Sequence, residues 1–151
     1  MRLFTRNGHD WSGRYPLIPT AHVIDDEAVL LGVDGVSDFD GLHSRKHDDE
    51  VQFYAFDMLV SEAEDLRKLP LTMRKTNLAR LLARRVVGIF LSDFEQGEIG
   101  PDLFRHACLM ALEGLVSKHR ESPYRGGRFA RWVKVKNRQH PAFRRIMDQF
   151  G

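Results

Sequence analysis

The chain has 151 residues, of which 42% are hydrophobic, and this predicts one compact domain spanning residues 1–151. No apolar run approaches the ~20 residues of a membrane span and no signal-peptide pattern is visible, so we expect a cytoplasmic protein without a membrane partner. The single cysteine, Cys108, excludes an internal disulfide, and the seven histidines lack metal-ligand spacing, which argues against a zinc site.

Charge is unevenly placed along the chain, although the net charge is only +2. Residues 1–112 carry 13 Lys/Arg against 18 Asp/Glu, whereas residues 113–151 carry 10 Lys/Arg against 3 Asp/Glu. A basic C-terminal third on an otherwise acidic chain predicts an anionic partner. A basic surface that only interacts with water is an equally good interpretation of the same pattern.

The first segment of the chain is strand-like. Residues 2–5 read as a strand, and Arg6-Asn7-Gly8 gives a turn signal. No hairpin mate comes before this strand, so we expect an unpaired edge, and unpaired edges favour pairing between two copies of a chain. The sequence therefore predicts a homodimer through this edge. Pro16 and Pro19 then exclude a long helix nearby.

Residues 22–31 form the next predicted strand, and Asp34-Gly35 marks the turn after it. The strand contains three consecutive acids, Asp25-Asp26-Glu27, which cost stability unless they meet water, a cation or a donor. A functional role and a solvent-facing edge both explain them. Residues 38–50 are polar and predict a surface loop or a short helix.

Residues 51–59 give the clearest strand, because apolar side chains occupy both of its faces, as in a central strand. Asp57 within this strand needs a partner. Phe56 is explained equally by a core position and by a pocket wall on which a base stacks.

A helix is predicted from Pro70 to about Arg85, with Thr72 as its N-cap. Its buried stripe is Leu78, Leu81 and Leu82, and its cations, which we expect on a solvated face, are Arg74, Lys75, Arg80 and Arg84. A short strand follows over residues 86–91. Pro101 begins a second helix at its favoured first position, with Cys108 as a core thiol rather than a nucleophile, and Gly114 ends it.

Two short strands, residues 113–118 and 132–136, are joined by a loop rich in glycine and arginine. Trp132, Lys134 and Lys136 alternate with Val133 and Val135, so we expect a cationic face with a β-branched core face behind it. Two ammonium groups about 7 Å apart on one face suit a phosphate or nucleic-acid backbone. A solvated strand face is the commoner meaning of such alternation.

Five motifs follow one another along the chain: Thr5-Arg6-Asn7-Gly8, Asp25-Asp26-Glu27, Tyr54-Ala55-Phe56-Asp57, Glu113-Gly114-Leu115-Val116-Ser117-Lys118 and Trp132-Val133-Lys134-Val135-Lys136. In this order they resemble the adenylation (nucleotidyltransferase) domain of ATP-dependent DNA ligases, and most closely the bacterial end-joining type. The resemblance implies an α+β fold, mainly of antiparallel sheets flanked by helices, of the ATP-grasp-like kind.

The same resemblance implies ATP or AMP and Mg²⁺ as ligands and DNA as a partner. It places Phe56 against the adenine ring, and Lys134 and Lys136 on the α-phosphate. Glu27 would bind ribose or position the metal, and Glu113 would help hold the metal. The residues expected near nucleic acid are Arg6, Arg125, Arg128 and Arg131.

Four features depart from the family pattern, one of which is that the segment from Pro16 to His22 is too short for the helix that family members usually carry there. The family's nucleophile is the lysine of a K-x-D-G motif, which occurs nowhere in these 151 residues, so we expect no covalent nucleotidyl transfer by this chain alone. Asp26 stands where the family has glycine, which puts nucleotide fit in doubt. The family's C-terminal OB-fold is also missing, and we therefore interpret the chain as a truncated domain.

Three functions compete on this basis. The first is a ligase-like domain that binds adenine nucleotide, DNA (weakly) or both without completing self-adenylation. The second is an active ATP-dependent DNA ligase or nucleotidyltransferase in DNA repair and recombination, with the lysine strand supplied upstream or by another chain. The third is a degenerate structural or partner-binding domain.

Overall fold

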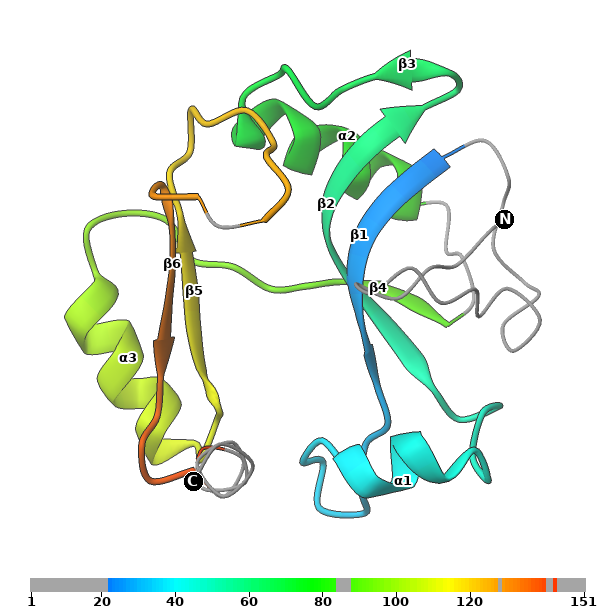
Figure 1. Cartoon of the computed structure of the whole chain (residues 1–151), viewed down its shortest axis with the longest axis vertical. Coiled ribbons are helices and arrows are strands. Elements are labelled where there is room, and N and C mark those ends of the chain that lie inside the picture. The colour runs from blue at the N-terminus through cyan, green and yellow to red at the C-terminus, as the bar shows by residue number, and fades with distance from the viewer. Residues whose placement is uncertain (1–21, 84–87, 128, 141–142, 144–151) are drawn as a thin grey trace.

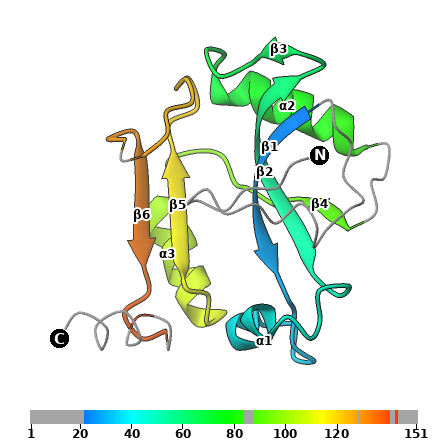
Figure 2. The ribbon, with the colours of Figure 1, turned by 45° about the vertical axis from the view of Figure 1, so that its right-hand side comes forward.

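The computed structural model describes residues 22–83, 88–127, 129–140 and 143. Two sheets stand side by side, and the segment 92–99 crosses from the first to the second (Figures 1 and 2). The strand predicted at residues 2–5 lies outside the described residues, so the homodimer stays a prediction. The elements are β1 (His22–Val29), α1 (Phe39–Ser44), β2 (Gln52–Ser61), β3 (Glu64–Asp65), α2 (Leu71–Leu82), β4 (Ile89–Leu91), α3 (Gly100–Leu109), β5 (Gly114–Lys118) and β6 (Trp132–Lys136).

The first sheet is built around β2, which confirms the prediction of a central strand at residues 51–59. Strands β1 and β3 pair with β2 antiparallel, and β4 pairs with it parallel. The register of β1 against β2 shifts between Asp25 and Asp26, so Asp25 lies opposite Asp57 while Asp26 lies opposite Ala55. This irregularity leaves Phe56 of β2 without a cross-strand partner in β1.

Helix α2 packs against this sheet and closes the main core. The predicted stripe is confirmed, because Leu78 is fully buried and Leu81 and Leu82 pack against the buried cluster. The buried cluster consists of Val51, Phe53, Ala55, Met58, Leu66, Leu78 and Ile89.

Among the described residues, every helix is too short or too polar to span a bilayer.

Helix α2 begins at Leu71, within one residue of the predicted start, but the predicted N-cap was wrong by two residues. Pro70 is the N-cap residue, no side chain caps the helix, and Thr72 lies inside its first turn. The Thr72 N–H donates instead to the carbonyl of Arg120, at 3.2 Å. The loop that follows β5 therefore supplies the acceptor that a capping side chain would otherwise provide.

The second sheet consists of β5 and β6, paired antiparallel. Helix α3 contacts β5 on the side facing away from the first sheet (Figure 1). The predicted core face of β6 was wrong, since Val133 and Val135 are 51% and 44% exposed. Alternation correctly predicted that both valines lie on one face of β6. That face stays exposed because α3 packs against β5.

Candidate functional site

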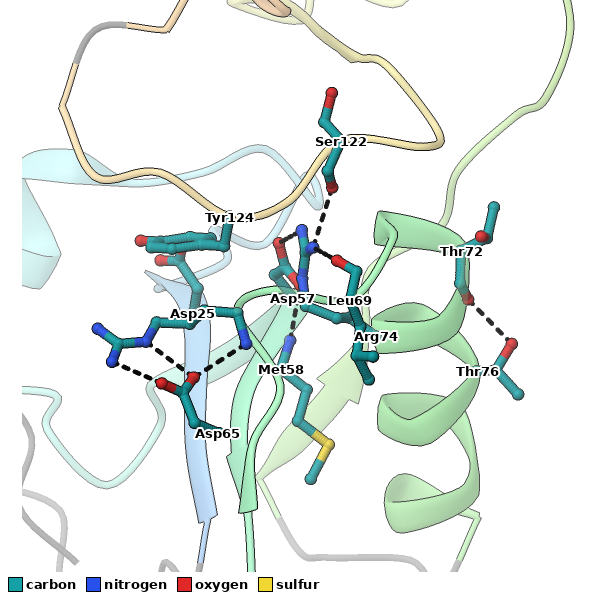
Figure 3. A network of polar contacts seen from close by, with 11 residues as sticks. Asp25, Asp57, Met58, Asp65, Leu69, Thr72, Arg74, Thr76, Ser122 and Tyr124 are labelled. Carbon is teal, nitrogen blue, oxygen red and sulfur yellow. Dashed lines mark hydrogen bonds and ion pairs between the residues drawn. The ribbon is translucent and has the colours of Figure 1, made fainter. Parts of the chain in front are cut away.

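A buried ion pair links the first sheet to the loop after β5 (Figure 3). The Arg74 guanidinium of α2 donates to both carboxylate oxygens of Asp57, at 2.8 and 2.9 Å, and both side chains are fully buried. It also donates to the carbonyls of Leu69 and Ser122, at 2.5 and 3.0 Å. The prediction of a solvated Arg74 was therefore wrong, because Asp57 requires a cation in the interior.

Tyr124 holds the same loop against the first sheet. Its hydroxyl donates to Asp25 at 3.2 Å, and its N–H donates to the Arg67 carbonyl at 2.8 Å. Burial, and then the Asp25 carboxylate, raise the pKa of Tyr124 to about 12, so it stays a hydrogen-bond donor. Burial also raises the pKa of Asp25, against the opposing effect of Lys118. These contacts fix where β5 runs relative to β2.

Lys118, at the end of β5, reaches across to the first sheet. Its ammonium lies 4.2 Å from the ring centroid of Phe56 and 4.3 Å from that of Trp132. Among the described residues the buried Lys118 Nζ has no hydrogen-bond partner, and neither has the buried Trp132 Nε1. Burial lowers the pKa of Lys118, while Asp57 and Asp25 partly offset this effect.

The two predicted phosphate-binding lysines meet at Glu113, directly before β5. Lys134 Nζ and Lys136 Nζ both lie 3.4 Å from Glu113 Oε1. Burial of the Glu113 carboxyl opposes ionisation, but the two ammonium groups together lower its pKa. The group is half-exposed and carries one more positive than negative charge, so it can accept a further anion.

Gly114 allows β5 and β6 to approach each other closely beside Glu113. Its φ is +156°, and a Cβ there would lie 2.1 Å from the Val135 carbonyl oxygen. Any other residue would push β6 away at the point where Lys136 faces Gly114 in register. Glycine therefore keeps Glu113 within reach of both lysines.

The register of the second sheet places both clusters on one face. Lys118 lies opposite Trp132, Val116 opposite Lys134, and Gly114 opposite Lys136, so these positions share one face of the second sheet. That face is directed towards the first sheet at Lys118, whose ammonium contacts Phe56 of β2. The face that contacts Phe56 at Lys118 is therefore the face of Lys134 and Lys136.

The remaining predicted residues lie elsewhere. Glu27 is exposed on β1, opposite Tyr54. Arg125 and Arg131 are exposed in the loop between β5 and β6, and Arg125 lies 5.6 Å from the Phe129 ring. Arg6 and Arg128 fall outside the described residues, so their roles stay predictions.

Two cations were missed as site residues. In the sequence Lys118 is identified only as part of a motif, although its position opposite Trp132 places it on the same face of the second sheet as Lys134. Lys75, assigned to a solvated face, is half-buried with its ammonium 4.0 Å from the Phe94 ring. Burial and then the nearby Lys118 lower the pKa of Lys75. Its contact with Phe94 follows from packing across segments and leaves no signal in the helix pattern.

A magnesium ion has limited support from the described residues. Within them no three Asp, Glu, His or Cys side chains are placed to hold a metal. Mg²⁺ usually takes only one or two carboxylates, together with water and substrate phosphates. Glu113 fits such a metal if the ion arrives with phosphates and the carboxylate releases its lysines.

These features define a class: an α+β domain of mainly antiparallel sheets, with an aromatic residue on the first sheet and paired lysines on the face of the second sheet that contacts it. The chain belongs to the ATP dependent DNA ligase domain family, whose model matches residues 1–136. Within this family it is similar to bacterial end-joining ligases. It is 33% identical over 147 residues to the multifunctional non-homologous end joining protein LigD of Pseudomonas aeruginosa, covering 90% of this chain and 18% of that protein.

Solved structures agree with the predicted fold. The crystal structure of the ligase domain of M. tuberculosis LigD superposes with a TM-score of 0.75 at 31% identity, over 89% of this chain and 46% of that one. The structure of mycobacterial DNA ligase D complexed with ATP and MES superposes with a TM-score of 0.76 at 30% identity, over 90% of this chain and 47% of that one. The predicted resemblance and fold class are thus confirmed, and the chain spans about half of these ligase domains.

Proposed function

We propose that this chain is a ligase-like adenylation domain that binds adenine nucleotide between its two sheets and binds DNA weakly. The observation that carries the proposal is the shared face of β5 and β6, on which Lys134 and Lys136 stand beside the position that contacts Phe56. An aromatic ring and two cations on facing sheets suit a base at one end and a phosphate at the other.

The roles in this proposal are those that the family resemblance implies. Phe56 stacks on adenine, and Lys134 and Lys136 hold the α-phosphate, with Glu113 as their counter-ion when no nucleotide is bound. Glu27, exposed on β1, is the candidate for the ribose or the metal. Mg²⁺, held by Glu113 and phosphate oxygens, would neutralise phosphate charge.

DNA binding is supported by the loop between β5 and β6. Arg125 and Arg131 are exposed there, and the half-buried Phe129 ring lies beside Arg125 and 6.2 Å from Trp132. Cations next to aromatic rings suit a single strand or a frayed end, where phosphates and unstacked bases are both available.

The test is a calorimetric titration of the 151-residue chain with AMP and with ATP. Phe56→Ala should weaken binding by about 1–3 kcal/mol, since the stacking surface is lost. Phe39→Ala is the matched control, because Phe39 is 56% exposed on α1 and stacks on His43. Equal affinity for wild type and Phe56→Ala would remove Phe56 from the site.

A second assay asks whether the chain completes the covalent step. With labelled ATP and Mg²⁺ the chain alone should retain no covalent adenylate, because no K-x-D-G lysine is present in residues 1–151. A stable, acid-labile label would contradict this and favour an active nucleotidyltransferase.

A further inference from the structure

Three exposed apolar side chains follow one another where α3 ends and the chain turns into β5. Leu109 and Met110 are 77% and 69% exposed, and Leu112 is 46% exposed. Val135 of β6 is 44% exposed on the face of the second sheet opposite to Lys134. Exposed apolar groups that gather in one region indicate a surface on which something docks. We call Leu109, Met110 and Leu112 the apolar patch.

The chain comes back to this patch as it leaves β6. Asn137 is 5% exposed, its N–H donates to the Glu113 carbonyl at 2.7 Å, and its side-chain amide donates to the Leu112 carbonyl at 3.1 Å. Two turns follow, in which the His140 N–H donates to the Asn137 carbonyl and the Phe143 N–H donates to the His140 carbonyl. Residues 144–151, outside the described part of the chain, therefore start close to the apolar patch.

The sequence after His140 has the pattern of an amphipathic helix. Pro141 suits the first turn of a helix, and the apolar residues then recur with the spacing i, i+3, i+4 and i+7, which is one face of a helix. They are Phe143, Ile146, Met147 and Phe150, and the residues between them are Arg144, Arg145, Asp148 and Gln149. A helix this short is marginal in water unless its apolar face packs against a surface.

We propose that residues 141–150 form a helix that docks on the apolar patch of their own chain. The helix would be about 15 Å long, and its apolar face would cover side chains that the described residues leave exposed. A segment tethered this closely has an effective concentration in the millimolar range, which favours its own patch over that of a second copy. Because Asn137 joins Leu112 to Glu113, the docked helix also fixes the turn that ends the second sheet.

The test is a double-mutant cycle on the full chain, followed by urea denaturation. Leu109→Gln and Ile146→Gln should each lower the urea midpoint, although Leu109 is 77% exposed to the described residues, because each removes one side of the same contact. The double variant should fall by less than the sum of the two shifts, since residues in contact are not additive. Val33→Gln is the matched control, because Val33 is fully exposed in the turn after β1, and its shift should add to that of Ile146→Gln.

A second measurement uses the wild-type chain alone. The backbone amides of residues 146–150 should exchange with deuterium at least about tenfold more slowly than in a free peptide of the same sequence. Exchange at the rate of the free peptide, or additive shifts for Leu109→Gln and Ile146→Gln, would refute the docked helix. A urea midpoint that rises with protein concentration, together with a dimer in sedimentation, would show that the helix docks on a second copy and would also overturn the proposal.

Discussion

Two carboxylate–cation clusters in the described part of the chain, one around Asp57 and one around Glu113, differ in burial and therefore in what they can do. At the junction of the sheets, Asp57 and Arg74 are fully buried, and both carboxylate oxygens of Asp57 accept from Arg74. At the other end of β5, Glu113 shares one oxygen between Lys134 and Lys136, which are 54% and 30% exposed. The first cluster fixes the fold and is closed to solvent. The second holds a surplus cation where solvent and ligands reach it.

The largest expected effect compares one carboxylate-to-amide change in each cluster. Asp57→Asn should lower the free energy of unfolding by about 3–5 kcal/mol, because it leaves Arg74 buried without its counter-ion. Glu113→Gln should change it by less than about 1 kcal/mol, because its pairs are half-exposed. Urea denaturation of both variants measures the difference. Equal effects would abolish the distinction between the clusters.

A third carboxylate, Asp26, sharpens the comparison because it is half-buried and lies beside another carboxylate, Asp25. Burial and then Asp25 raise its pKa from 3.8 to about 6. The folded chain therefore binds more protons than the unfolded chain between these values, and stability falls as the pH rises from about 4 to about 6. Asp26→Asn should remove this loss and stabilise the chain at pH 7 by about 2 kcal/mol.

The measurement for Asp26 is urea denaturation of wild type and Asp26→Asn at pH 4 and pH 7. The gain should be present at pH 7 and small at pH 4, where the wild-type carboxyl is largely protonated when folded. A gain of the same size at both values would show that Asp26 acts through packing and not through its charge.

DNA binding extends the comparison to the exposed loop. Arg125→Gln with Arg131→Gln should weaken binding to single-stranded DNA and reduce the slope of log affinity against log salt by about 1 for each arginine. Arg45→Gln, in the exposed turn after α1, is the control. Unchanged affinity and slope in the double variant, measured by fluorescence anisotropy, would place DNA elsewhere.

The smallest expected effect concerns Glu113 as a counter-ion. Without metal, Glu113→Gln should bind inorganic phosphate more tightly than wild type, because Lys134 and Lys136 no longer have a competing carboxylate. A half-exposed pair limits the gain to about 1 kcal/mol or less. Weaker phosphate binding by this variant would mean that Glu113 orients the lysines for the anion.

Local patterns predicted much of the fold and part of the site. Alternation along residues 132–136 correctly placed Lys134 and Lys136 on one face, and apolar residues on both faces of residues 51–59 correctly made that strand central. Arg74 was misplaced because helix periodicity cannot show that Asp57, seventeen residues earlier, requires a buried cation. The bond from Tyr124 to Asp25 joins residues ninety-nine positions apart, and no local pattern carries that information.

The exposure of β6 was also predicted wrongly. Valines alternating with lysines normally indicate a core face, but whether a face is buried depends on what packs against it, and α3 contacts β5. Lys118 was overlooked for a related reason. Its contact with Phe56 exists only once the loop after β5 is held against the first sheet by Tyr124 and the Ser122 carbonyl.

The most direct test of the account is calorimetric titration of ATP into the 151-residue chain and into the Lys134→Gln/Lys136→Gln variant. Lys46→Gln/Lys68→Gln, which neutralises two exposed lysines, serves as the matched control. If the shared face of β5 and β6 binds the phosphates, the first variant should lose affinity by more than about tenfold, or 1.4 kcal/mol, while the control binds like wild type. The same affinity in all three proteins, or no ATP binding by the wild-type chain, would contradict a nucleotide site on this face.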